Sequence, residues 1–337
     1  QTCALPIYRI GIHGRLFSWI KNWLTNRSQR VVLNGKISSS QSVLSSVIQG
    51  SVLGPLLFLI FINEISDNID SESLLFADDC KIYRQIKSHA DEEILQKDIN
   101  KLLDWSKECK LPFNASKCKV LHLGKNNQKA NYTLDNIMLE ITTAEKDVGI
   151  FIDENLNFKN HLNNLIQKAN MKIGLIKRNF KTRRPEVMTK LFKQYIRPCL
   201  EYCTPIWSPS SIGDTDRLEK IQKRFLRLIP SLNGLTYEQK LNHCNLQTLA
   251  YRRNKFDLLL THNIVNGGLG LNCYKFFKFS KERERMETRS YAKNCLIKEN
   301  FRTNIRKNFF AVRVVDHWNN LPVSMKDKTY ANFRNSM

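Results

Sequence analysis

A long stretch near the start of the sequence contains no acidic residue. No Asp or Glu occurs between Tyr8 and Gln49, so this stretch cannot contribute a carboxylate to a metal site. The chain also has no Cys-x-x-Cys pair, and the spacing of its nine cysteines matches no common zinc site. Its longest apolar run, residues 52–62, is interrupted by Gly54 and Pro55 and is too short to span a bilayer. These absences disfavour a zinc module and a membrane-spanning protein.

The charged residues that are present are strongly unbalanced. The 337 residues include 53 Lys and Arg against 31 Asp and Glu, a formal net charge of +22. Such an excess repels itself unless a polyanion is near, so nucleic acid is the expected partner and an anionic membrane surface is the competing one. A hydrophobic content of 42% is enough for a substantial core. The chain looks intracellular, and we expect it in the nucleus, the cytoplasm or both. In such a chain the nine cysteines are expected to be reduced thiols rather than disulfides.

The first part of the chain predicts a mixture of helices and strands. An apolar stripe predicts a helix over residues 15–25, and Asn34-Gly35 predicts a hairpin with a type I′ turn. Further helices are expected over residues 56–65 and after Asp91, which we expect to cap its helix. Strands are expected at residues 120–123 and 148–152.

After about residue 155 the pattern becomes helical and basic. Apolar stripes predict three helices, and Pro198 should kink or end the second of them. The third, over residues 216–229, has the stripe Leu218, Ile221, Phe225 and Ile229. Strands confined to the first part and helices to the second predict an α+β fold.

Two adjacent aspartates, Asp78 and Asp79, lie between the short apolar runs at residues 74–77 and 80–83. This pattern predicts the tip of a β-hairpin. Adjacent carboxylates at an exposed turn repel each other, so they suit a site where divalent cations supply positive charge. An ordinary surface turn is the alternative for this pair taken alone.

Five sequence blocks occur in an order that is typical of one enzyme family. They are Gln-Gly-Ser-Val-Leu-Gly-Pro-Leu-Leu-Phe at 49–58, Phe-Ala-Asp-Asp at 76–79, Asn-Ala-Ser-Lys-Cys at 114–118, Val-Gly-Ile-Phe-Ile-Asp at 148–153 and Ile-Arg-Pro-Cys-Leu-Glu-Tyr at 196–202. With these blocks the chain resembles the reverse transcriptases of non-LTR (LINE-type, jockey-like) retrotransposons. The resemblance covers residues 10–230 well and the remainder loosely.

The resemblance implies a division into domains. Residues 8–155 would form part of a polymerase palm, an antiparallel sheet with packed helices. Residues 156–235 would form a helical thumb, and residues 236–337 a basic helical C-terminal extension. Residues 1–7 look like the conceptual translation of a sequencing-library adapter, so we exclude them from the expected fold.

The resemblance also implies the catalytic chemistry. Asp78 would be the metal-bridging carboxylate and Asp79 a supporting one for two Mg²⁺ ions, with Mn²⁺ as an alternative. Two such ions about 3.5–4 Å apart activate a 3′-hydroxyl and neutralise the leaving pyrophosphate. Lys117 matches the family's basic residue near the leaving phosphate and would be a general acid, with a solvated lysine as the alternative.

Several further residues are implied to bind substrates. Phe76 would lie beside the incoming nucleotide, although a core position is an equal alternative. Positions that would contact the nucleotide or template are Gln49, Gly50, Ser51, Phe76 and Ala77. Val148 and Gly149 would hold the primer terminus. The cations Lys220, Lys223, Arg224 and Arg227 fall on one helix face and would contact the nucleic-acid backbone, with a solvated basic face as the alternative.

The family's first catalytic aspartate has no counterpart in the acid-free stretch before Gln49. We expect it to be encoded upstream of Tyr8, so the chain as given is predicted to be inactive alone. The intact enzyme would use an RNA template, a DNA primer from target DNA and deoxynucleoside triphosphates, and no membrane. The alternatives are an RNA-dependent RNA polymerase, disfavoured by the Gln-Gly block, and a degenerate or domesticated nucleic-acid-binding remnant without catalysis.

Overall fold

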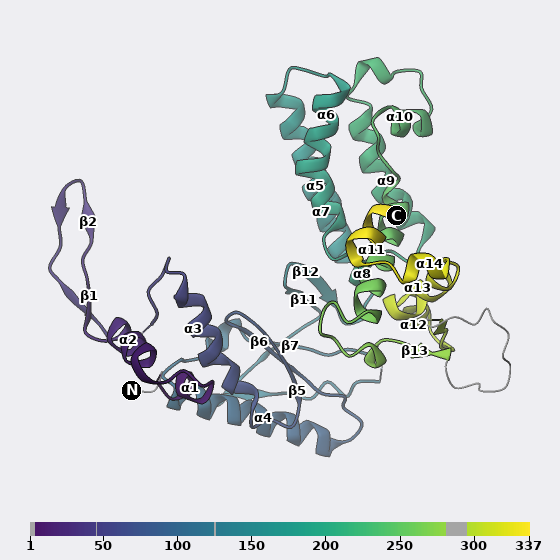
Figure 1. Cartoon of the computed structure of the whole chain (residues 1–337). Helices are drawn as coiled ribbons and strands as arrows, with labels where there is room; N and C mark the ends of the chain where they lie inside the picture. Colours follow the sequence, from purple (N-terminus) through teal and green to yellow (C-terminus); the bar gives the residue numbers. More distant parts are fainter. Residues whose placement is uncertain (1–3, 45, 125, 281–294) are drawn as a thin grey trace. The chain divides into compact units, whose positions relative to one another are not determined.

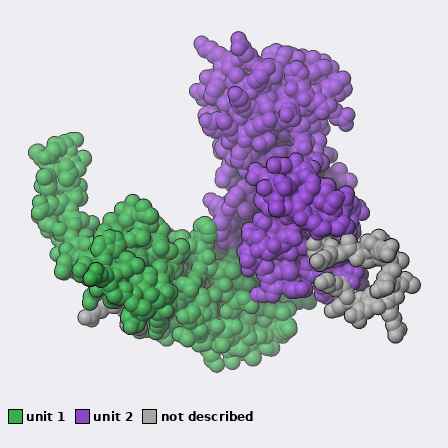
Figure 2. All heavy atoms as spheres, in the orientation of Figure 1, with its two compact units in different colours: residues 1–142 green, residues 143–337 purple. Residues whose placement is uncertain are grey.

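The computed structural model describes residues 4–44, 46–124, 126–280 and 295–337. The chain divides into two compact units, residues 1–142 and 143–337, coloured separately in Figure 2. Unit 1 mixes helices with short strands, and unit 2 is mainly helical, so the predicted α+β class is confirmed. The predicted boundaries at residues 155 and 235 are finer than this division and stay predictions. Within the described ranges, no helix is both long and apolar enough to cross a bilayer.

Unit 1 contains four α-helices and two 3₁₀ turns among its described residues. Their bounds are α1 Ala4–Arg9, α2 Gly14–Leu24, α3 Leu53–Ile62, η1 Asn63–Ser66, α4 His89–Glu108 and η2 Ala115–Lys117. Helix α1 overlaps the segment that we interpreted as adapter-derived, and Ile7 packs in a small core with Ile20 and Leu57. The interpretation of residues 1–7 stays a prediction.

The strands of unit 1 form two-stranded pairs. Their bounds are β1 Arg27–Gln29, β2 Val32–Leu33, β3 Lys36–Ile37, β4 Gln41–Val43, β5 Glu72–Phe76, β6 Asp79–Tyr83, β7 Lys119–Leu121, β8 Thr133–Leu134, β9 Ile137–Met138 and β10 Glu140–Thr142. The pairs are antiparallel except β7 with β10, which is parallel. The expectation of one antiparallel sheet is therefore wrong for the described residues.

Two local predictions in unit 1 can be compared with the structure. The turn between β2 and β3 has positive φ at both Asn34 and Gly35, as a type I′ turn requires, so that prediction is confirmed. Helix α4 instead begins after Ser88, and Asp91 is its third residue. The Asp91 carboxylate accepts a hydrogen bond from the Ser88 backbone N–H at 3.1 Å. The prediction of Asp91 as the cap itself was wrong, because the two residues share a capping box.

Unit 2 begins with a hairpin and continues as a helical array. Its strands are β11 Ala144–Asp147, β12 Ile150–Asp153, β13 Lys278–Phe279 and β14 Leu296–Ile297. Its helices are α5 Lys159–Asn179, α6 Pro185–Leu191, η3 Phe192–Ile196, α7 Arg197–Glu201, α8 Thr204–Trp207, α9 Ile212–Leu226, η4 Pro230–Leu232, α10 Tyr237–His243, α11 Leu249–Val265, η5 Cys273–Lys275, α12 Asn304–Asn308, α13 Phe310–Asn319, α14 Val323–Lys326 and α15 Tyr330–Ser336.

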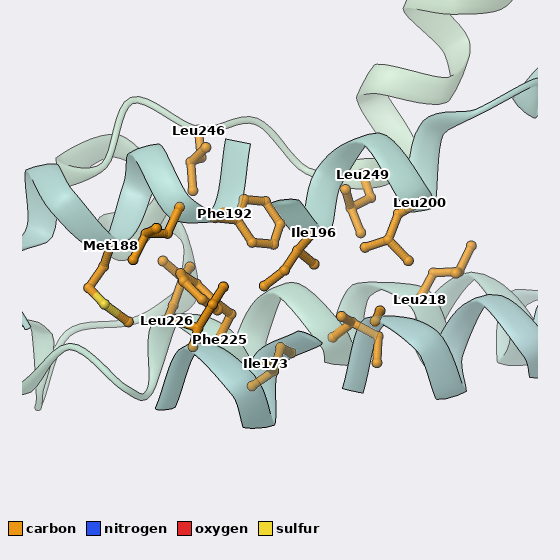
Figure 3. Packing of buried hydrophobic residues seen from close by; sticks show 14 of the residues in the cluster. Ile173, Met188, Phe192, Ile196, Leu200, Leu218, Phe225, Leu226, Leu246 and Leu249 are labelled. Atoms are coloured by element: carbon orange, nitrogen blue, oxygen red, sulfur yellow. The ribbon is translucent and has the colours of Figure 1, made fainter. Parts of the chain in front are cut away.

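The main core of unit 2 lies where α5, α7 and α9 pack side by side (Figure 1). The predicted stripe of the third helix faces this core, with Leu218, Phe225 and Ile229 fully buried and Ile221 nearly so. Figure 3 shows side chains from α5, α6, η3, α7, α9 and α11 pointing toward one another. The second predicted helix consists of α6, the π-helical turn η3 and α7 in direct succession, and Pro198 is the second residue of α7. The helix therefore does not end at Pro198, and the kink stays a prediction.

A second core joins α11 to the last helices of unit 2. It contains Leu258, Phe310 and Trp318 among its buried members. The Arg313 guanidinium binds both carboxylate oxygens of buried Asp257, at 2.8 and 2.9 Å. The C-terminal helices are therefore attached to α11 by packing and by a buried ion pair.

Candidate active site and basic helix

The hairpin of β5 and β6 presents the two adjacent aspartates at its tip, as predicted. Phe76 pairs with Asp79 across the ladder, which leaves Ala77 and Asp78 as the two-residue loop. Ala77 has a φ of +53°, a conformation that residues with a Cβ adopt at a cost. Strained loop residues of this kind concentrate at functional sites.

The two faces of this hairpin have different surroundings. Leu75 and Ile82 pack against a core cluster that includes Ile62 and Leu102. The opposite face carries Phe76, which is 62% exposed. Phe76 is therefore not part of a core among the described residues, and its proposed contact with the nucleotide stays a prediction.

Asp78 and Asp79 are both exposed, and no Lys or Arg ammonium or guanidinium lies within 4 Å of either carboxylate in the described part of the chain. Uncompensated oxygen donors of this type match the ligand preference of Mg²⁺. Across the described residues, no group of three or more Asp, Glu, His or Cys side chains gathers closely enough to hold a metal. The aspartate pair fits a divalent ion chemically, and it provides only part of a coordination sphere.

The residues before α3 form a turn that is stabilised by hydrogen bonds of the Ser51 hydroxyl. Gly50 has a φ of +80°, which glycine adopts freely, and Gln49 is exposed beside it. The Ser51 hydroxyl donates to the Ile48 carbonyl at 2.6 Å and accepts from the Gly54 N–H at 3.0 Å. Ser51 therefore stabilises the start of α3, whatever else it contacts.

Lys117 ends the short turn η2 and is exposed. Its ammonium has no carboxylate partner within the described ranges. This position is compatible both with the general-acid role of Lys117 and with a solvated lysine, so both stay predictions.

Val148 and Gly149 form the turn between β11 and β12, not the start of a strand as expected. Their φ values are +43° and +87°. A β-branched residue such as Val rarely adopts positive φ, so this turn is held by other contacts. The Tyr202 hydroxyl donates to the Val148 carbonyl at 3.0 Å, and a Cβ on Gly149 would lie 3.5 Å from the Tyr202 ring. Tyr202 was missed as a site residue, although it closes the fifth sequence block.

The helix predicted over residues 216–229 both begins and ends earlier, since α9 spans Ile212–Leu226 and Arg227 is its C-cap residue. The four predicted cations are all exposed, opposite the buried stripe. Lys223 places its ammonium 4.9 Å from the ring centroid of Tyr237, while Lys220 and Arg224 line a groove against α5. This groove has a volume of about 240 Å³. Its lining residues are Ile166, Asn170, Arg217, Lys220, Ile221 and Arg224.

Two hydrogen bonds fix the cations of this groove. Arg217 donates to the Asn163 amide oxygen at 2.6 Å, and Arg224 donates to the Asn170 amide oxygen at 2.9 Å. Both bonds join residues that are 54 positions apart in the sequence. Residues 163–170 of α5 therefore lie alongside residues 217–224 of α9. Arg217 was missed by the sequence analysis because it lies one turn before the predicted cluster, and its Asp214 partner at 3.0 Å partly compensates its charge.

A buried carboxylate of α9 keeps the helix in place. Glu219 accepts hydrogen bonds from the Leu249 backbone N–H at 3.1 and 3.2 Å and from the Tyr237 hydroxyl. Burial and the neighbouring Glu219 carboxylate raise the pKa of Tyr237 well above its usual range. Glu219, the one acid among the buried residues of α9, is thereby bonded to α10 and α11, and Lys223 of the next turn lies over the ring of the same Tyr237.

Comparisons with known proteins agree with these features. Residues 6–173 match the family described as reverse transcriptase (RNA-dependent DNA polymerase). The chain is 26% identical over 224 residues to the probable RNA-directed DNA polymerase from transposon X-element of Drosophila melanogaster, an alignment covering 63% of this chain and 25% of that protein. It is 25% identical over 228 residues to the RNA-directed DNA polymerase from mobile element jockey of the same species, covering 64% and 25%. The chain thus spans about a quarter of the length of these curated relatives.

Proposed function

Residues 6–173 belong to the reverse transcriptase family, in its jockey-like non-LTR retrotransposon branch, and from this premise we propose that the complete protein copies RNA into DNA. The observation that carries the proposal is the exposed pair Asp78 and Asp79 at a hairpin tip inside the family match. The substrates are an RNA template, a DNA primer from target DNA, and deoxynucleoside triphosphates. The nucleus, the cytoplasm or both are the proposed location.

Divalent metal ions are general cofactors of this family, and we assign Asp78 and Asp79 as ligands of two Mg²⁺ ions, which Mn²⁺ can replace. When bound, the ions activate the primer 3′-hydroxyl and neutralise the pyrophosphate. Asp78 in the loop and Asp79 at the first position of β6 would be the carboxylates that hold the ions, with the larger share assigned to Asp78. The pair provides only part of a coordination sphere, so the proposal needs further ligands from outside the described residues of this chain.

Other residues of unit 1 orient the substrates in this proposal. Gly50 lets the backbone approach the base pair closely, and Gln49 can both donate and accept there. Exposed Phe76, next to Ala77, packs on the incoming nucleotide. Ser51 contributes indirectly by fixing the turn, since its hydroxyl is already bonded. Lys117 donates a proton to the leaving pyrophosphate.

Unit 2 holds the primer and the duplex in this proposal. The turn at Val148 and Gly149 contacts the primer terminus, and Tyr202 is a positioning residue that holds the turn. The exposed cations of α9 contact backbone phosphates without reading sequence. In these terms residues 8–155 act as a partial palm, residues 156–235 as a thumb and residues 236–337 as an extension.

A second candidate function is nucleic-acid binding without catalysis. It is favoured by one observation, the lack of a third metal-binding side chain near the aspartate pair within the described ranges. The net charge of +22 supports binding in either case.

Primer extension on an RNA template tests the proposal. The chain as given should add no deoxynucleotide above the level of an Asp78→Ala control. The same chain extended upstream with the natural sequence, to include a strand with an aspartate, should extend the primer in Mg²⁺. Activity of the chain as given, or inactivity of the extended protein when it binds primer–template normally, would contradict the proposal.

A further inference from the structure

Exposed aromatic and basic side chains gather in residues 296–309, well outside the family match. Phe301 is 40% exposed, Ile305 50% and Phe309 47%. The adjacent Phe310 is 6% exposed and packs in the second core of unit 2. Because Phe310 already anchors α13, the outward position of Phe309 is not required by the fold. We call Phe301, Phe309 and the cations around them the aromatic–basic patch.

Each exposed ring in the patch has a cation beside it. The Lys307 ammonium lies 5.9 Å from the centroid of Phe301, and the Arg306 guanidinium lies 5.1 Å from the centroid of Phe309. Helix α12, which carries both cations, packs against α13 (Figure 1). A ring next to a cation is the combination that stacks a base while contacting its phosphate.

The acids in this region do not cancel its charge. Glu299 is bonded by Arg306 and by the Lys278 ammonium at 3.2 Å, and these bonds lower the pKa of its carboxyl group. Asp316 pairs with Lys298. Arg302 and Lys307 are both exposed, and neither has a carboxylate within 4 Å among the described residues. The patch therefore presents positive charge next to exposed rings.

We propose that the aromatic–basic patch binds single-stranded RNA. Bases stack on Phe301 and Phe309, and phosphates contact Arg302 and Lys307. The amides of exposed Asn300 and Asn304 stand in sequence next to these residues, and an amide can both donate to and accept from a ribose 2′-hydroxyl, which DNA lacks.

The charge favours RNA over a protein partner as the occupant. Arg302 and Lys307, which have no carboxylate partner among the described residues, match the repeated negative charge of a nucleic-acid backbone. A second copy of this chain would bring another net charge of +22 to the contact. The inference goes beyond the proposed polymerase activity, since it concerns binding away from the aspartate hairpin and needs no catalysis.

Fluorescence anisotropy with a labelled oligouridine tests the proposal on the full chain. Changing Phe301 and Phe309 together to Leu keeps apolar bulk and removes the rings, and should weaken binding about tenfold or more. Changing Arg302 and Lys307 together to Gln should flatten the slope of log affinity against log salt by about 1.4, at about 0.7 per contact with a single strand. Phe180→Leu is the matched control, since Phe180 is 38% exposed beside Lys181 and should not affect binding.

Photo-crosslinking identifies the contact independently of affinity. An oligomer containing 4-thiouridine should crosslink to peptides that contain Phe301 or Phe309, with circular dichroism confirming that each variant is folded. Crosslinks confined to other regions, or equal weakening by Phe180→Leu, would overturn the proposal. Equal affinity for oligothymidine would overturn the choice of RNA. Self-association that the Phe301 and Phe309 changes abolish, measured by sedimentation, would instead assign the patch to a second copy.

Discussion

Val148 shows how one residue can depend on a distant partner. Its positive φ is unfavourable for a β-branched side chain, and the Tyr202 hydroxyl bond to its carbonyl helps to hold it. The sequence predicted a strand here because Val148 and the residues after it are apolar and β-branched. The partner lies 54 positions along the chain, so no local pattern revealed the turn.

We predict that Tyr202→Phe lowers the melting temperature by about 2 °C, because one hydrogen bond to the strained turn is lost. Tyr195→Phe is the matched control, since Tyr195 is 54% exposed and its hydroxyl makes no hydrogen bond in the described structure. Differential scanning calorimetry of both variants makes the comparison. Equal melting temperatures for the two would show that Tyr202 does not hold the turn.

His161 is a buried histidine whose neutral form the fold requires. It is 2% exposed, its Nδ1 accepts from the Phe151 N–H at 3.3 Å, and its ring meets Trp207 edge-on at 5.2 Å. Burial, with a smaller contribution from the Lys168 charge, lowers the pKa of His161 to about 4. Because this folded-state pKa lies below the unfolded value, His161 stabilises the fold fully above about pH 6.5, and that stability is lost as pH falls toward 4.

We therefore predict that unfolding free energy declines between pH 6.5 and 5, and that His161→Asn reduces this decline. The complete contribution of the histidine, reached below pH 4, is roughly 3 kcal/mol. Burial also lowers the pKa of His262, so part of the decline should persist in the variant. Urea unfolding at four pH values gives the slopes, with His89→Asn, a largely exposed histidine, as control. A slope unchanged by His161→Asn would contradict this account.

At the scale of whole elements, α9 packs in the core through one face and presents cations on another. Its apolar stripe and Glu219 face the interior, and its cations face solvent or the groove against α5. The sequence predicted this division from helical periodicity alone, although Arg227 and Ile229 lie just after the end of α9. The bonds from Arg217 and Arg224 to α5 were not predictable, since they depend on how two helices align.

We predict that changing Lys220, Lys223, Arg224 and Arg227 together to Gln weakens binding to duplexes of unrelated sequence alike. The slope of log affinity against log salt should flatten by about two to four, because each phosphate contact contributes roughly 0.9. The matched control changes four lysines away from this face to Gln, namely Lys240, Lys255, Lys275 and Lys328. The net charge of the control therefore falls by the same amount as that of the test variant. If the slope is unchanged in the α9 variant while its helical content is intact, these cations do not contact phosphates and the face is simply solvated.

At the scale of the whole molecule, the sequence predicted contacts that are local and missed those that are distant. The hairpin tip at Asp78 and the type I′ turn at Asn34 depend on a few contiguous residues, and both predictions are confirmed. The expected antiparallel palm sheet is represented among the described residues only by two-stranded pairs, because pairing between strands depends on segments far apart in the chain. The roles of the site residues depend on substrates, so they stay predictions.

The central claim is that the Asp78 carboxylate holds the catalytic metals. In the protein completed upstream, Asp78→Asn keeps the shape of the side chain and removes the charge. We predict that RNA-templated primer extension in Mg²⁺ falls by roughly 10³-fold or more, while Asp79→Asn costs about 10- to 100-fold. Primer–template affinity, measured in parallel, should change less than about threefold in either variant. Near-normal extension by Asp78→Asn would contradict the assignment of this hairpin as the catalytic site.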